Sequence, residues 1–148
     1  MKTIDKSNIL VCGTVRNVSL KLLPFLHIMD KSLNGFRSTD YLICESFSTD
    51  DTKQVLLKIA TMRTNFNFFT DSEISADESR RTVRIASARI QLLEYVKTHG
   101  EKYNFIVMAD LDGVNRDVRR QEVETSRKAH SRPNRSNVEE IRLTDFRI

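Results

Sequence analysis

Two aspartates are separated by a single residue in the stretch FIVMADLDGVN, residues 105–115. Asp110 and Asp112 follow an apolar run that predicts a buried strand, and side chains two apart on an extended chain point the same way. Carboxylates in this arrangement suit Mg²⁺ or Mn²⁺, which takes one or two of them and leaves its other positions to water and substrate phosphates. The spacing therefore predicts a metal site that would neutralise a diphosphate. The alternative is an ordinary strand-end turn, which Gly113 also suits.

A helical pattern at residues 77–98 precedes this stretch in the chain. When its positions are counted in threes and fours, one arginine falls on the apolar face. This residue is Arg89, and the apolar members of the face are Ile85, Leu92, Leu93 and Val96. An unpaired charge there would be costly, so Arg89 should meet an anion. The partner is either a structural carboxylate, Glu45 or Asp110, or an anionic ligand.

Three more arginines, Arg80, Arg81 and Arg84, gather at the start of the same pattern. Cations oppose the helix macrodipole at that end, which is tolerable mainly when phosphate or acidic groups lie nearby. They are candidates for binding an anionic ligand. For Arg80 the alternative is neutralisation by Asp77 and Glu78.

Four apolar, β-prone runs predict the strands that position these residues: 8–15, 40–47, 65–71 and 103–110. Helical patterns separate these strands. The first runs from Val18 to Met29 and should be kinked or shortened by Pro24. The second, at 48–62, has a capping box of Ser48 and Asp51, and the third, at 77–98, has acidic residues in its first turn and His99-Gly100 as its stop.

This alternation predicts right-handed βαβ crossovers and a Rossmann-like, doubly wound, mainly parallel α/β sheet. Ligands of such sheets bind beyond the carboxyl ends of the strands. The polar residues at those ends are Arg16, Asn17, Glu45, Asp110 and Asp112. Glu45 is the candidate to accept a hydrogen bond from a ribose or base, although it could equally pair with a neighbouring arginine.

Residues 116–148 show no sustained periodicity, so we expect one α/β domain at 1–115 followed by a basic, irregular tail. The tail holds nine Lys and Arg against six Asp and Glu, of the chain's 24 and 20, which leaves the body nearly neutral. A nucleic-acid partner is therefore not expected. A short helix at 117–128 is a weaker prediction.

No apolar run is long enough to cross a bilayer and no secretion signal is recognised, so we expect a cytoplasmic protein without a transmembrane segment. Cys12 and Cys44 lie in apolar strand patterns, which predicts buried free thiols rather than a zinc site.

Four segments in order resemble the donor-binding half of the GT-A-fold glycosyltransferases, with the nearest likeness to small viral and algal families and to fungal capsule-associated mannosyltransferases. The segments are CGTVRNV, ESFSTDDTKQVLLKI, RTVRIASARIQLLEYV and YNFIVMADLDGVN, which fall within residues 8–115. The resemblance implies transfer of a sugar from a nucleotide-diphospho-sugar donor to a glycan, protein or lipid acceptor. It further implies Mn²⁺ or Mg²⁺ on Asp110 and Asp112, and a donor site formed by Arg16, Asn17, Glu45, Arg81, Arg84, Arg89 and Asp110. No catalytic residue is assigned.

The sequence departs from the family pattern at two places. Arg89-Ile90 stands where the family helix usually reads Arg-Asn, and the unpatterned tail stands where acceptor-binding elements normally follow the metal motif. We therefore expect a donor half without its acceptor half, the product of a truncation or frameshift. Two other functions stay open: a non-catalytic nucleotide-sugar-binding fragment, or a haloacid-dehalogenase-like phosphatase with Asp110 as its nucleophile and Asp112 as its general acid and base.

Overall fold

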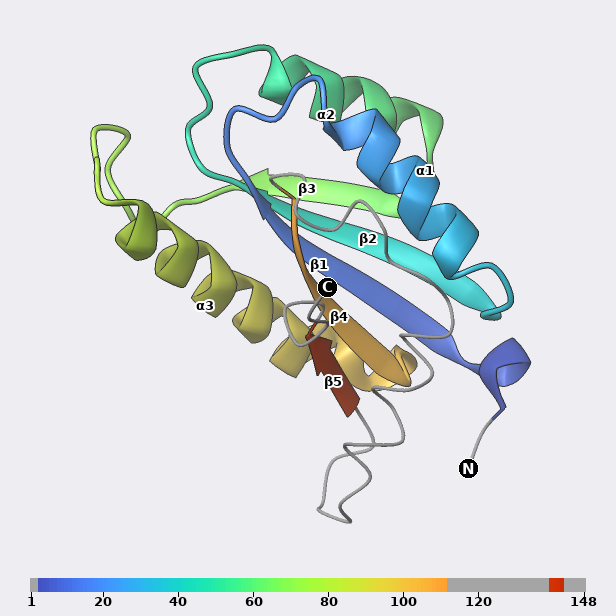
Figure 1. Ribbon diagram of the computed structural model, residues 1–148. Helices are drawn as coiled ribbons and strands as arrows, with labels where there is room; N and C mark the ends of the chain where they lie inside the picture. Colours follow the sequence, from blue (N-terminus) through green and yellow to red (C-terminus); the bar gives the residue numbers. More distant parts are fainter. Residues whose placement is uncertain (1–2, 112–138, 143–148) are drawn as a thin grey trace.

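Five parallel strands form the sheet of this protein in the computed structural model, which describes residues 3–111 and 139–142, with Asp110 and 139–142 described by their backbone (Figure 1). The strand order is β3-β2-β1-β4-β5. The strands are β1 Asn8–Val15, β2 Ser38–Glu45, β3 Phe66–Thr70, β4 Phe105–Asp110 and β5 Glu139–Arg142. The predicted parallel α/β sheet is thus confirmed.

Within residues 3–111, three α-helices cover the two faces of the sheet. Helices α1 Leu22–Ser32 and α2 Thr52–Met62 lie on one face, and α3 Arg81–His99 lies on the other (Figure 1). Short 3₁₀ turns, η1 Ile4–Lys6 and η2 Gly100–Lys102, precede β1 and β4. The result is a three-layer arrangement in which the central strands are covered on both sides.

The side chains of β1 and β2 alternate between two apolar cores. Val11 and Ile43 pack in the core under α1 and α2, and Cys12 and Cys44 pack in the core under α3. Both cysteines are buried thiols that form no disulfide, as predicted. Because residues of both parities are apolar, these strands read as continuous hydrophobic runs in the sequence.

The chain reverses its direction of winding at β1, since β2 pairs with one of its edges and β4 with the other. The register places Thr14 beside Cys44 on one side and beside Asp110 on the other. The carboxyl ends of the central strands therefore meet at one edge, which is the position where doubly wound sheets bind ligands.

Leu111, the residue between the two predicted metal-binding aspartates, is 2% exposed and belongs to the core under α1 and α2. It packs on Gly13 so closely that a Cβ on Gly13 would lie 2.2 Å from Leu111 Cδ1 and 3.0 Å from its Cγ. A side chain at position 13 would displace Leu111. This contact fixes where the chain leaves β4.

Several local predictions need correction. Helix α1 begins at Leu22 rather than at Val18, so Pro24 lies in the first turn, where its missing N–H is not needed. Helix α2 has Asp51 as its N-cap without a side-chain cap bond, so the capping box of Ser48 and Asp51 is wrong. Helix α3 begins at Arg81, so no acidic residue lies in its first turn.

The tail expected to be irregular contributes β5, which runs parallel to β4 with Val107 opposite Ile141. Its apolar residues are too sparse to predict a strand from periodicity. The strand forms through its hydrogen-bonded pairing with β4. The helix predicted at 117–128 lies outside the described residues.

Candidate functional site

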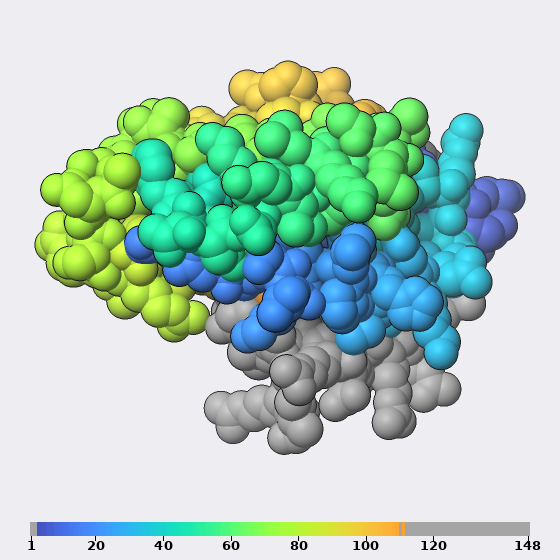
Figure 2. Space-filling model, turned by 90° about the horizontal axis from the view of Figure 1, so that it is seen from above, coloured from blue at the N-terminus to red at the C-terminus, as the bar shows by residue number. Residues whose placement is uncertain are grey.

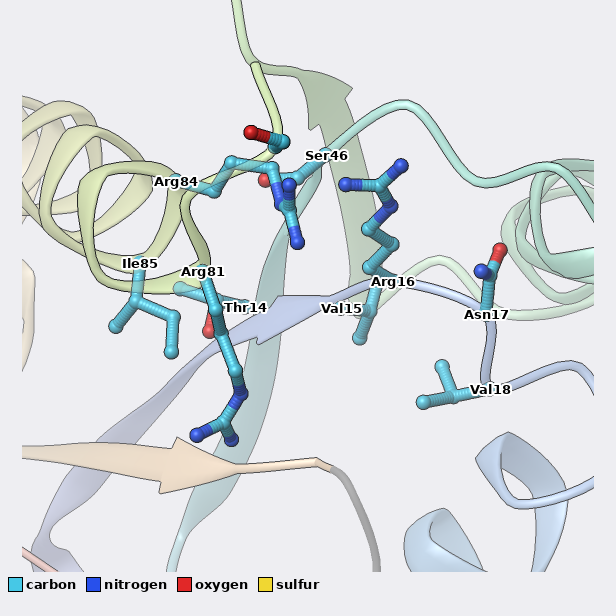
Figure 3. A pocket seen from close by; sticks show the side chains of 10 residues that line it. Thr14, Val15, Arg16, Asn17, Val18, Ser46, Arg81, Arg84 and Ile85 are labelled. Carbon is cyan, nitrogen blue, oxygen red and sulfur yellow. The ribbon is translucent and has the colours of Figure 1, made fainter. Parts of the chain in front are cut away.

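A pocket of about 460 Å³ opens at the carboxyl ends of β1 and β2 (Figure 3). Its walls come from the end of β1 and the segment after it, from the residue that follows β2, and from the start of α3. The lining residues are Thr14, Val15, Arg16, Asn17, Val18, Ser46, Ser79, Arg81, Arg84 and Ile85. The three contributing segments, coloured blue, teal and yellow-green, meet at one end of the molecule (Figure 2). This is the size range of small-ligand sites.

Arginine dominates the charge of the pocket. Arg16 enters from the β1–α1 loop, whereas Arg81 and Arg84 enter from the first turn of α3. Figure 3 shows Arg84 extending toward Arg16 and Ser46, and Arg81 extending away from them. None of the ten lining residues is acidic, so an anion is the ligand that this pocket favours.

The β1–α1 loop is tied to the β2–α2 loop by three consecutive backbone N–H groups. Those of residues 17, 18 and 19 donate to Ser48 Oγ at 3.0 Å, Thr52 Oγ1 at 2.8 Å and Asp50 Oδ2 at 3.2 Å. In dinucleotide-binding folds, amides of this first loop hold phosphate. Here they are already used, so anion binding in the pocket depends on the arginine side chains.

Asn17 takes part in these hydrogen bonds between the β1–α1 loop and the segment at residues 48–52, which we call the interlock. Its backbone is left-handed, with φ at 52°, and its Oδ1 accepts the N–H of Thr49 at 2.8 Å. Asparagine tolerates this conformation better than most residues. Asn17 lines the pocket, and its amide oxygen is used to hold the two loops together.

Asp50 is the charged member of the interlock. Its Oδ1 accepts from the N–H and the hydroxyl of Thr52, and its Oδ2 accepts from the N–H of Ser19. Desolvation alone would raise the pKa of this carboxyl, but the hydrogen bonds from Thr52 and Ser19 outweigh it and lower the pKa to about 2. The ionised form of Asp50 therefore stabilises both loops around the pocket.

Glu45 does not line the pocket, which argues against its predicted contact with a ribose or base. It is 1% exposed, with Oε1 accepting the N–H of Ser48 at 2.5 Å and Oε2 accepting the hydroxyl of Thr70 at 3.3 Å. No arginine is among its hydrogen-bonding partners in the described part of the chain. Glu45 thus orders the turn after β2.

The predicted phase of α3 is wrong, and Arg89 is exposed to solvent. The buried residues of the helix are Ala88 and Leu92, while Leu93 is 40% exposed. The helix faces the sheet with Ala88, whose side chain is small. The larger apolar residues around Arg89 therefore predicted the wrong buried face. Arg89 does not line the pocket, and the need for an anionic partner disappears.

Arg80 forms an ion pair with Glu78, with 2.9 Å between Nη2 and Oε2, as the alternative interpretation predicted. Hydrogen bonds from Arg80 chiefly lower the pKa of Glu78 to about 2. Arg84 Nη1 donates to the backbone carbonyl of Glu78. These contacts order the segment before α3 and separate Arg80 from the pocket arginines.

The metal-site prediction rests on two aspartates at the end of β4. The backbone of Asp110 pairs with Thr14, a lining residue, so the strand end reaches the pocket edge. Asp112 lies outside the described residues. Within the described ranges no three His, Cys, Asp or Glu residues gather as a metal site. Mg²⁺ needs only one or two carboxylates when phosphate completes its shell, so the metal site at Asp110 and Asp112 stays a prediction.

Sequence reasoning missed Asp71, a residue that positions α3. It is 1% exposed, directly follows β3, and its Oδ1 accepts from Ser87 Oγ at 3.0 Å and from Gln91 Nε2 at 2.5 Å. Its place at a strand end was the available signal. The lining residues Thr14, Ser46 and Ser79 were also missed, and their residue types carry no distinguishing sequence signal.

A comparison of the chain with protein-family models finds no match, and a comparison with curated protein sequences finds none either. The structure therefore defines the class of protein as an α/β protein with a parallel sheet, helices on both faces and a basic pocket at the carboxyl ends of its strands. Within residues 3–111 and 139–142, no helix combines the length and apolar character needed to cross a bilayer.

Proposed function

We propose that this chain binds a nucleotide-diphospho-sugar in the arginine-lined pocket and takes part in transfer of its sugar to an acceptor. The observation that carries the proposal is the position of Arg16, Arg81 and Arg84 around one hollow at the carboxyl ends of the strands. A diphosphate is the part of such a donor that guanidinium groups recognise best, because their planar N–H pairs match phosphate oxygens.

The lining also offers surface for the uncharged parts of the donor. Val15, Val18 and Ile85 supply apolar contacts, and Thr14, Ser46 and Ser79 carry hydroxyls that can bond to a sugar or ribose. This mixture of apolar walls and a few polar groups is typical of small-molecule sites. The GT-A-like order of the sequence segments is the reason for choosing a sugar donor over other phosphate esters.

Asp110 and Asp112 are the residues that would hold Mn²⁺ or Mg²⁺. When bound, such an ion neutralises charge on the diphosphate leaving group. The chain's own part is to place Asp110 at the end of β4, beside Thr14 and the pocket. Leu111, buried against Gly13, holds the backbone between the two aspartates in place.

Calorimetric titration with a panel of nucleotide-diphospho-sugars, with and without Mn²⁺, tests the proposal. One donor should bind, and Asp110→Ala and Asp112→Ala should each remove the Mn²⁺-dependent part of the affinity. Arg89→Ala is a control for the loss of a surface charge, because Arg89 is exposed on α3 and lies outside the pocket.

Transfer is measured separately, as release of the nucleoside diphosphate when candidate glycan, protein or lipid acceptors are added. If a donor binds but no acceptor leads to release of the nucleoside diphosphate, the protein is a nucleotide-sugar-binding module and not a transferase. If none of the donors binds, the proposal fails.

A further inference from the structure

Backbone N–H groups of the β1–α1 loop, which hold phosphate in dinucleotide-binding folds, are already used by other residues in this protein. The N–H groups of Asn17, Val18 and Ser19 all donate to side chains of the neighbouring loop. Each of those acceptors would have to be displaced before a phosphate could use the amides. An anion that enters the pocket must be held in another way.

Side chains provide the alternative. The guanidinium of Arg16 has no hydrogen bond or ion pair to any other residue of the described ranges, although it is only partly exposed. Arg84 uses Nη1 on the carbonyl of Glu78, which leaves its other N–H groups for a ligand. The two side chains approach each other over Ser46 from opposite walls of the pocket (Figure 3).

Two cations that face each other without a carboxylate between them repel, and a bound anion relieves that repulsion. Among the described residues that line the pocket, none is acidic. A single phosphate group can satisfy one guanidinium fork bidentately, whereas a diphosphate offers a separate set of oxygens to each. The pocket, at about 460 Å³, has room for the larger group.

We infer that Arg16 and Arg84 form a diphosphate clamp that binds its ligand without a divalent ion. This inference rests on the proposed function for the identity of the natural ligand, and it assigns the diphosphate affinity to two side chains on opposite walls. The metal ion, held at the end of β4, then adds to the affinity for the donor and is not needed for the diphosphate to bind.

Titration of the full chain with inorganic pyrophosphate in EDTA tests the clamp, with orthophosphate as the comparison ligand. Pyrophosphate should bind more tightly than orthophosphate, and both affinities should fall with added salt because the attraction is screened. Arg16→Ala and Arg84→Ala should each weaken pyrophosphate binding about tenfold or more, the loss expected for one charge-assisted contact.

Control variants separate the clamp from general charge and from misfolding. Arg89→Ala removes the same charge from the exposed side of α3 and should bind pyrophosphate like the wild type. Arg16→Ala breaks no hydrogen bond within the described residues, and Arg16→Lys keeps the charge but loses the fork, so Arg16→Lys should recover only part of the affinity.

The outcomes are distinguishable from those of the proposed function. Pyrophosphate binding that requires Mg²⁺, or that equals wild type in Arg16→Ala and Arg84→Ala, overturns the clamp and leaves metal-dependent donor binding standing. Pyrophosphate binding in EDTA with no nucleotide sugar bound supports the clamp and overturns the donor assignment. Absence of binding by either class of ligand overturns both.

Discussion

Thr52 connects the two loops that shape the pocket, and its hydroxyl can be removed with little change of shape. Thr52 is fully buried at the start of α2; its Oγ1 accepts the N–H of Val18 at 2.8 Å and donates to Asp50 Oδ1 at 2.5 Å. In Thr52→Val a methyl group replaces the hydroxyl. The N–H of Val18 then lies buried without its acceptor.

The loss follows from that unpaired donor. A buried N–H left without a partner costs about 1–3 kcal/mol, and the Asp50 contact adds little because it lies near solvent. We therefore expect Thr52→Val to lower the free energy of unfolding by about 2 kcal/mol. For a chain of 148 residues this corresponds to a melting temperature lower by about 6 °C.

Urea unfolding followed by circular dichroism measures the change, with an unchanged slope showing that the two end states are the same. Thr82→Val is the matched control, because Thr82 is exposed on α3. Thr52→Ser keeps the hydroxyl and should recover most of the lost stability. A Thr52→Val protein no less stable than Thr82→Val would refute the assignment of the interlock as the element that orders the loops.

Two further predictions concern the same region. Asp50→Asn should destabilise the protein near neutral pH. The folded-state pKa of Asp50 is lowered from 3.8 to about 2, so its contribution to the free energy of unfolding is complete above the unfolded value and is lost as the pH falls through about 2. The difference in stability between Asp50→Asn and wild type in urea unfolding should therefore shrink toward about pH 2.5. A difference that stays constant with pH would contradict this. Gly13→Ala should cost about 1–3 kcal/mol in the same assay, since its Cβ meets Leu111 Cδ1 at 2.2 Å, and Leu111→Ala should make the substitution milder; wild-type stability of Gly13→Ala alone would show that Leu111 moves aside freely.

The parallel sheet was predictable because its signals are local. The apolar run at 8–15 matches β1, and the runs at 40–47, 65–71 and 103–110 match β2, β3 and β4 within a few residues at either end. A strand buried on both faces must be apolar at successive positions, whatever its neighbours are. The short β5 has no such run, and its pairing with β4 is a tertiary fact.

Helix phase and hydrogen-bonding partners were less predictable. The spacing of large apolar residues predicts Arg89 on the buried face, whereas the buried residues of the helix are Ala88 and Leu92. Ser48 fitted a capping box by spacing, yet its hydroxyl accepts the N–H of Asn17, 31 residues earlier in the chain. Competition between local and distant partners is decided only when the loops are brought together.

The sequence by itself determined the strand–helix alternation, the buried thiols and the candidates Arg16, Asn17, Arg81 and Arg84, because residue type and periodicity carry that information directly. The tertiary structure decided which candidates share a pocket. These four residues line one pocket, whereas Arg89 is exposed to solvent and Glu45 accepts hydrogen bonds from Ser48 and Thr70. The physical reason is that a site is made by side chains whose direction depends on packing, and packing is fixed by contacts between segments that lie far apart in the chain.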